Sequence, residues 1–181
     1  MPLLSIFIIA RDEADRIGRT IQAVRALSDD IVVIDSGSTD GTQAVAEQLG
    51  ARVIFNPWPG YGQQKRFAED QCRHDWLLNL DADEVVPEDL ATEIARLFAH
   101  GEPEADAYEL RIAEIFPGEP APHRFAYVLA PVRLYRKSKG RYSPSPVHDR
   151  VDLAADARIA RLKGTVHHFS VRSLGEQMDK L

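Results

Sequence analysis

The sequence predicts an α/β fold: a doubly wound, mostly parallel sheet with a smaller antiparallel region. Through the first hundred residues, short apolar and β-branched runs alternate with amphipathic helical patterns, and the connections between them are short. Continuous apolar runs are typical of strands that are buried on both faces, as in a parallel sheet. After Gly101 the pattern changes to alternating segments separated by long loops, which predicts the antiparallel region.

The elements of the first half follow from local signals. Apolar residues three and four positions apart indicate each helix. The second helix ends at Gly50, a residue that favours the backbone conformation found just after helices, and the fourth has Pro87 in its first turn. In chain order, the sequence predicts strands over 3–10, 30–35, 52–55 and 76–80, alternating with helices over 14–27, 45–49, 63–72 and 87–98.

The second half is predicted to hold fewer regular elements. Residues 107–116 and 132–136 alternate between apolar and polar side chains, as strands with one solvated face do, and 117–122 is proline-rich. Residues 158–169 add a last predicted strand, and residues 173–181 resemble the start of a helix. We expect residues 1–181 to form a single domain.

Composition excludes several classes of protein. With 181 residues and 44% apolar side chains, the chain can fill a core. A net charge of −6 argues against a generic nucleic-acid binder, so no nucleic-acid partner is expected. The single cysteine, Cys72, excludes an intramolecular disulfide framework and a multi-cysteine zinc site. No signal sequence or membrane-spanning run is recognisable, which predicts a cytoplasmic protein.

Charge is unevenly distributed along the chain. Residues 133–172 contain ten basic and three acidic side chains, a net charge of +7, whereas the remainder carries −13. This asymmetry favours a docking surface for an anionic partner or an anionic membrane. A solvated face whose charges pair across the fold is the alternative.

Acidic residues follow three of the predicted strands: Glu13, Asp35, and the pair Asp81 and Asp83. In open α/β sheets, ligands bind at the carboxyl ends of strands, where these acids would repel one another unless a cation or hydrogen-bonding ligand intervened. Two carboxylates in the pattern D-x-D suit Mg²⁺ or Mn²⁺, which in turn would hold a diphosphate. Alternatively, the acids of this turn cap the helix that follows, since Asp83 and Glu84 stand just ahead of Pro87. The glycine motifs of dinucleotide enzymes and P-loop NTPases do not occur in the sequence.

Taken together, the segments SIFIIARDE, DDIVVIDSGSTDGT and WLLNLDADE resemble family 2 glycosyltransferases of the GT-A fold. The segments GYGQQKRFAE, VHDRV and HHFS resemble the bacterial branch that includes lipopolysaccharide-core glucosyl- and heptosyltransferases. The resemblance implies that residues 1–100 form a Rossmann-like half that binds a nucleotide sugar, and that residues 101–181 form the acceptor side. Members of this branch usually continue into further C-terminal helices.

The resemblance also implies roles for individual residues. Asp35 would accept the N3–H of uracil, and Lys65 would reach the nucleotide from the helix after the third strand. Asp83 and His168 would bind the metal, with His167 as a competitor for the second place. Asp149 would be the general base, although this branch usually has glutamate there. The residues implied to bind the nucleotide sugar are Ala10, Arg11, Glu13, Asp35, Ser36, Gly37, Lys65, Asp81 and Ala82.

Each role has a structural alternative. Asp35 could cap the turn that follows it, Lys65 could be solvated, and Asp149 could form an exposed ion pair with Arg150. His167 and His168 could be ordinary strand residues. Trp58 and Tyr61, in the loop before Lys65, are more often packing groups than sugar platforms, and stacking on a sugar or base is the alternative.

The implied activity is an inverting transfer of a sugar from a nucleotide diphosphate donor, with UDP favoured, to a hydroxyl of a glycan or glycolipid acceptor. Mg²⁺ or Mn²⁺ is the implied cofactor, and lipopolysaccharide core is a candidate acceptor. Peripheral contact with the inner face of the cytoplasmic membrane would bring enzyme and acceptor together. Two rivals remain: a catalytically silent sugar-binding module, and a nucleotidyltransferase. The second is disfavoured because residues 10–13 lack a glycine-rich basic loop.

Overall fold

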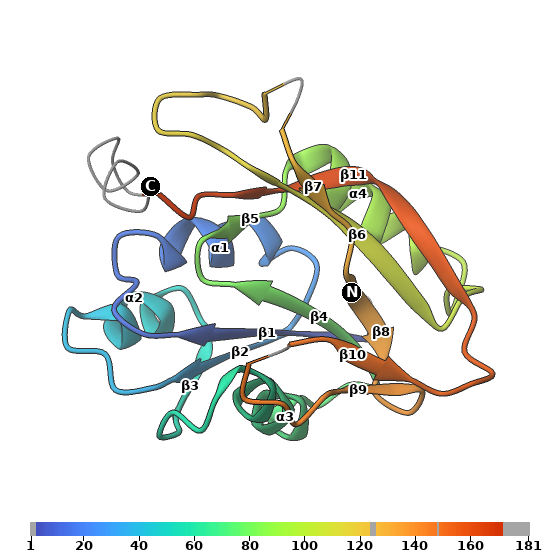
Figure 1. Cartoon of the computed structure of the whole chain (residues 1–181), viewed down its shortest axis with the longest axis horizontal. Coiled ribbons are helices and arrows are strands. Elements are labelled where there is room, and N and C mark those ends of the chain that lie inside the picture. Colours follow the sequence, from blue (N-terminus) through green and yellow to red (C-terminus); the bar gives the residue numbers. More distant parts are fainter. Residues whose placement is uncertain (1–2, 124–125, 148, 172–181) are drawn as a thin grey trace.

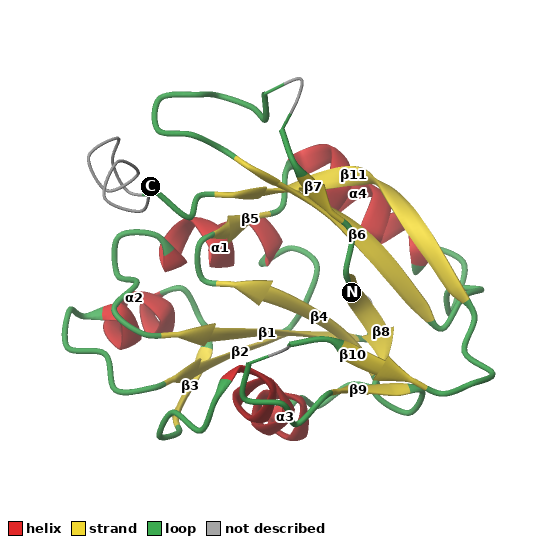
Figure 2. Cartoon of the chain, in the orientation of Figure 1, coloured by secondary structure: helices red, strands yellow, loops and turns green. Residues whose placement is uncertain are grey.

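A computed structural model describes residues 3–123, 126–147 and 149–171. Within these residues a nine-stranded sheet crosses the molecule, four helices pack against it, and a separate two-stranded sheet lies beside helix α3 (Figures 1 and 2). The large sheet has the strand order β3-β2-β1-β4-β8-β6-β11-β5, with β7 paired to β6. None of the described helices is long and apolar enough to cross a membrane.

The first half alternates strand and helix as predicted, and its first four strands run parallel. This arrangement brings the carboxyl ends of β1, β2 and β4 to one edge of the sheet. In chain order the elements are β1 (Leu4–Ala10), α1 (Ile17–Val24), β2 (Asp30–Asp35), α2 (Thr42–Gln48), β3 (Arg52–Phe55), α3 (Tyr61–Gln71), β4 (Trp76–Asp81), β5 (Glu84–Val85) and α4 (Glu88–Leu97).

The second half extends the same sheet. Strand β8 runs antiparallel to β4 and β6, as predicted for this region, but β11 runs parallel to β6. The predicted antiparallel region is thus confirmed for β8, and the last predicted strand, β11, lies between β6, to which it is parallel, and β5, to which it is antiparallel. The elements are β6 (Ala107–Glu114), β7 (Val128–Leu129), β8 (Val132–Arg136), β9 (Gly140–Tyr142), β10 (Val151–Leu153) and β11 (Ile159–His168). The helix start predicted over residues 173–181 lies outside the described residues.

Side chains alternate between the two faces of each strand, and this divides the core into two clusters. One face packs against α1, α2 and α4 through residues such as Ile8 and Leu110. The other packs against α3 and the β9–β10 hairpin through residues such as Phe7, Leu77 and Tyr135. We call the second one the α3 face. Helices on both faces confirm the predicted doubly wound α/β architecture.

Two predicted boundaries differ from the structure for local reasons. The first helix begins at Ile17 rather than Ala14, because residues 13–16 form a turn in which the Arg16 amide donates to the Glu13 carbonyl (3.0 Å). The segment expected to cap the fourth helix instead forms β5. Helix α4 has Pro87 before its first residue and no side-chain cap, so the capping interpretation of Asp83 and Glu84 is wrong.

The start of α3 packs very closely against residues 143–146. The amides of Tyr61 and Gly62 donate to the carbonyls of Pro146 (3.2 Å) and Ser145 (3.0 Å). A Cβ added to Gly62 would lie 2.0 Å from the Ser143 carbonyl oxygen, so only glycine allows this approach. The contact fixes the segment that leads to Asp149.

We therefore expect Gly62→Ala to destabilise the protein by about 1–3 kcal/mol, because the helix or the facing segment must move. Thermal unfolding should show a midpoint several degrees lower. Gly18→Ala is the matched control, since its Cβ would meet only ordinary contacts at 3.5 Å or more. Equal melting temperatures for the two variants would contradict the prediction.

Candidate active site

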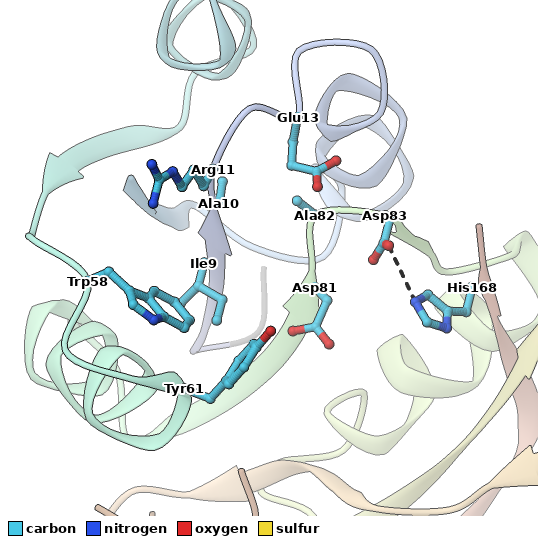
Figure 3. Close-up of a pocket in the computed structure, with 10 residues that line it drawn as sticks. All are labelled: Ile9, Ala10, Arg11, Glu13, Trp58, Tyr61, Asp81, Ala82, Asp83 and His168. Atoms are coloured by element: carbon cyan, nitrogen blue, oxygen red, sulfur yellow. Dashed lines mark ion pairs between the residues drawn. The ribbon is translucent and has the colours of Figure 1, made fainter. Parts of the chain in front are cut away.

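A pocket of about 460 Å³ lies at the carboxyl ends of β1 and β4. We call it the strand-end pocket (Figure 3). Its walls come from the first strand and the loop after it, the loop before α3, the β4–β5 turn and the end of β11. The lining residues are Ile9, Ala10, Arg11, Glu13, Trp58, Tyr61, Asp81, Ala82, Asp83 and His168.

Seven of the twelve site residues implied by the resemblance line this pocket, although they come from three separate parts of the chain. These are Ala10, Arg11, Glu13, Asp81, Ala82, Asp83 and His168. Asp35, Ser36, Gly37, Lys65 and Asp149 do not line it. The parallel topology explains the convergence, because β1 and β4 are adjacent and end at the same edge.

The Asp83 carboxylate lies close to basic side chains from two distant parts of the chain. Its carboxylate lies 3.4 Å from His168 Nε2 and 3.5 Å from Arg16 Nη1, and Figure 3 marks the contact with His168. Burial acts to lower the pKa of His168, but the Asp83 carboxylate outweighs it and the net shift is upward. Arg16 also holds both oxygens of Glu13 at 2.6 Å. His168, and not His167, lines the pocket.

A polar network lies beneath the pocket. Its buried members are Lys65, Asn79, Glu84, Arg133 and Tyr142, and its partly exposed members are Asp81 and Asp149. Arg133 is its centre: it donates to Asn79 Oδ1 (2.5 Å), Asp81 Oδ2 (3.2 Å) and Glu84 Oε1 (3.2 Å). Tyr142 donates to the same Asn79 oxygen at 2.6 Å. Glu84 in turn accepts the backbone amide of Asp81 at 2.9 Å. These bonds fix the orientation of Asp81 at the floor of the pocket.

Lys65 joins the pocket floor to Asp149. Its fully buried Nζ lies 3.0 Å from Asp81 Oδ1 and 2.5 Å from Asp149 Oδ2, and 5.1 Å from the centre of the Tyr142 ring. Burial acts to lower the pKa of Lys65, but Asp81 and its neighbours raise it above the ordinary value. The same pairing holds the pKa of Asp81 well below its usual range, against the effect of burial. A solvated Lys65 is therefore excluded, and its ammonium faces carboxylates rather than the pocket.

Asp149 lies outside the strand-end pocket, and the ammonium of Lys65 lies between its carboxylate and that of Asp81. Its side chain remains 39% exposed, so a ligand at the surface can still reach it. The structural alternative for Asp149 was an exposed pair with Arg150, but Arg150 pairs with Asp152 at 3.1 Å and Asp149 pairs with Lys65.

Asp35 is fully buried and bonded within its own turn. Its carboxylate accepts the amides of Gly37 (2.8 Å) and Ser38 (3.0 Å), the Ser38 hydroxyl, and the Gln43 amide group (2.7 Å). These bonds match the alternative in which Asp35 caps the following turn. Contact with a nucleobase stays a prediction.

The sequence does not indicate the role of several residues that belong to the site. Arg133 has no signal of its own in the sequence, because it is one of ten basic residues in 133–172, and Glu84 belongs to the segment WLLNLDADE but is considered there only as a helix cap. Trp58 and Tyr61 were expected to be packing groups, yet they are 44% and 51% exposed and meet edge to face at 4.8 Å on the pocket wall (Figure 3). Such an exposed pair can stack on a flat ligand.

Among residues 3–123, 126–147 and 149–171, no group of three or more His, Cys, Asp or Glu side chains is arranged to hold a metal by itself. Asp83 and His168 are close enough to share one ion. Since Mg²⁺ is often held by one or two carboxylates together with substrate phosphates and water, the pair fits a site completed by a bound phosphate.

Sequence comparison identifies related proteins. The model of the glycosyl transferase family 2 matches residues 5–155. An uncharacterized glycosyltransferase of Rickettsia prowazekii is 37% identical over 188 residues, covering 99% of this chain and 64% of that protein. The lipopolysaccharide core biosynthesis glycosyltransferase LpsC of Rhizobium meliloti is 32% identical over 191 residues, covering 98% of this chain and 67% of that protein. The chain thus spans about two thirds of the length of these relatives.

Solved structures show the same fold. S. aureus TarS, residues 1–349, superposes with a TM-score of 0.67 at 16% identity, over 92% of this chain and 60% of that chain. A mycobacterial protein superposes with a TM-score of 0.64 at 20% identity, over 97% and 69% of the two chains. The fold is that of GT-A glycosyltransferases. With a family match over most of its length, this chain belongs to glycosyltransferase family 2.

Proposed function

We propose that this protein transfers a sugar from a nucleotide diphosphate donor to a hydroxyl of a glycan or glycolipid acceptor, with inversion at the anomeric carbon. The observation that carries the proposal is the convergence of Asp81, Asp83 and His168 in one pocket, with Asp149 held beside it by Lys65. The similarity to LpsC supports a lipopolysaccharide-core acceptor.

The pocket suits the diphosphate end of the donor. Asp83 and His168 would hold Mg²⁺ or Mn²⁺: the carboxylate is the kind of oxygen ligand that both ions prefer, and His168 Nε2 lies 3.4 Å from it. The bound ion would offset negative charge on the leaving nucleoside diphosphate. Arg11, whose side chain is 66% exposed at the rim, can pair with a phosphate oxygen. The faces of Trp58 and Tyr61 can stack on the base or the sugar.

Asp149 is the candidate general base. A carboxylate that removes the proton from the acceptor hydroxyl lets the oxygen attack the anomeric carbon from the face opposite the diphosphate, so a single displacement inverts the configuration. Lys65 holds this carboxylate at 2.5 Å, and the same ammonium binds Asp81 on the pocket floor. The base is thereby fixed relative to the donor site.

The donor can be identified by thermal unfolding with UDP-, GDP- and ADP-sugars, each with and without Mn²⁺. We expect one nucleotide to raise the melting temperature, and more so with Mn²⁺, because a ligand at 100 times its Kd stabilises by about 2.7 kcal/mol. Asp83→Asn should remove the Mn²⁺-dependent part of the shift. Asp89→Asn, on the exposed side of α4, is the control and should keep it.

An unchanged Mn²⁺ response in Asp83→Asn would refute the metal role. The activity itself is tested with the donor identified by this screen, by following donor hydrolysis and transfer to lipopolysaccharide core acceptors. Donor binding without any turnover would instead favour the silent binding module.

A further inference from the structure

One part of the α3 face has no covering element among the described residues. Helix α3 and the β9–β10 hairpin cover β1, β2, β4 and β8 on this face. After Ala107, strands β6 and β11 lie beyond that cover, and α4 lies on their opposite face (Figure 1). A Cβ added to Gly164 of β11 would lie 2.7 Å from Leu90 Cβ of α4. The exposed strip of β6 and β11 is continuous with the face that carries Asp81 and Arg133.

A groove of about 490 Å³ runs over this strip. We call it the cationic groove; it is lined by Arg111, Val128, Ala130, Arg161, Leu162 and Lys163. Alternation along the strands explains the charge. Arg111 of β6 and Arg161 of β11 alternate with the buried core residues Leu110 and Leu162, so both point to the α3 face. Lys163 lies where the register of β11 shifts; it lines the same groove, and its backbone amide donates to Glu93 of α4.

The groove holds excess positive charge. Arg161 pairs with Glu109 at 2.6 Å, but within the described part of the chain the side chains of Arg111 and Lys163 have no ion-pair or hydrogen-bond partner. The alternative of charges that pair across the fold therefore fails for these two. Two uncompensated cations around a small concavity, in a protein of net charge −6, are suited to a ligand with concentrated negative charge.

The groove also lies at a useful distance from the active site. Only β8 separates β6 from β4, the strand that ends in Asp81. With neighbouring strands about 4.8 Å apart, the groove begins roughly 10 Å from the line of β4. That is the reach of one or two sugar units, so one molecule can occupy the groove and extend toward β4, the strand whose Asp81 binds Lys65.

We infer that the cationic groove binds a phosphate group of the acceptor. The naming of the ligand as an acceptor rests on the proposed transferase function. Phosphate binding in the groove does not depend on that function. The recognised chemistry is a phosphate mono- or diester, carried either by a glycan or by a lipid headgroup. Arg111 and Lys163 make charge-assisted contacts with the phosphate. Arg161 also contacts the phosphate while it stays paired with Glu109.

The test compares Arg111→Ala/Lys163→Ala with the matched control Arg25→Ala/Arg96→Ala, which removes the same charge from exposed helix positions. Inorganic phosphate and glucose 6-phosphate are titrated by calorimetry, with glucose as the uncharged reference. Sedimentation with phosphatidylglycerol–phosphatidylcholine vesicles, and with phosphatidylcholine alone, examines the lipid source. Circular dichroism checks that each variant is folded.

We expect the groove variant to bind the phosphate probes at least about tenfold more weakly than the wild-type protein, and the control to bind as the wild type does. A loss confined to the soluble probes assigns the phosphate to a glycan; a loss with phosphatidylglycerol vesicles assigns it to a lipid headgroup. Equal binding by both double variants overturns the inference. Because no donor is present in these titrations, failure of the transferase proposal would leave their result unchanged.

Discussion

Asp149→Asn is expected to reduce kcat by about 10²- to 10⁴-fold, the usual contribution of a positioned general base. Asparagine keeps the shape of the side chain, and its carbonyl oxygen can still accept a hydrogen bond from Lys65, now 2.5 Å from Asp149. It cannot accept the proton of the attacking hydroxyl. Steady-state kinetics with the donor identified by the thermal screen would measure the loss.

Donor affinity should change little in this variant, because Asp149 does not line the strand-end pocket. Asp152→Asn is the control: Asp152 is an exposed acid on β10 that, among the residues the structure describes, pairs only with Arg150 on the same segment. If Asp149→Asn lowers donor binding and leaves kcat intact, Asp149 is not the base. The distinction requires kcat and the donor Kd to be measured separately, since a change in KM alone mixes the two.

The sequence was most informative where the pattern of burial is simplest. The runs that became β1, β2 and β4 are buried along nearly their whole length, so continuous apolar segments predicted them within a residue or two. The sequence predicted the position of strand β11 but not its direction, because the alternation of apolar and polar side chains is the same in parallel and antiparallel strands.

The residues of the site likewise fall into those that the sequence could predict and those that it could not. Residues at the strand ends could be predicted, because parallel topology alone brings Glu13 and the pair Asp81 and Asp83 to one edge. The network beneath them could not. Arg133 comes from β8, a strand whose place beside β4 is fixed by long-range pairing, and nothing near it in sequence indicates that it meets Asn79 and Glu84.

Lys65 shows how the resemblance and the geometry differ. The resemblance implied a lysine that reaches the nucleotide, whereas in the structure its ammonium is enclosed by Asp81, Asp149 and the ring of Tyr142. A cation in this position compensates two carboxylates that would otherwise repel each other across the pocket floor. Its effect on donor and acceptor is then indirect, through the side chains that it holds.

Lys65→Met is accordingly expected to destabilise the protein by about 3 kcal/mol. Removing one member of a buried ion pair leaves the remaining charge uncompensated, at a cost of about 3–5 kcal/mol, and the lower end applies because Arg133 still faces Asp81 at 3.2 Å. Denaturant unfolding measures the change. Lys137→Met is the matched control. Within the described residues the Lys137 ammonium donates to two backbone carbonyls, of Glu69 (3.5 Å) and Cys72 (3.1 Å), and its loss should cost less than about 1 kcal/mol.

The pH dependence of this destabilisation distinguishes a loss of charge pairing from a loss of packing. The pKa of Asp81 is depressed in the folded protein, so the stability that its pairing supplies is present above the unfolded value, about 3.9, and is lost as pH falls toward the folded value. The difference in unfolding free energy between wild type and Lys65→Met should therefore be full at pH 6 and shrink below about pH 4. A difference that stays constant across that range would mean that Lys65 stabilises the fold by packing alone, and the electrostatic pairing of Lys65 with Asp81 would be refuted.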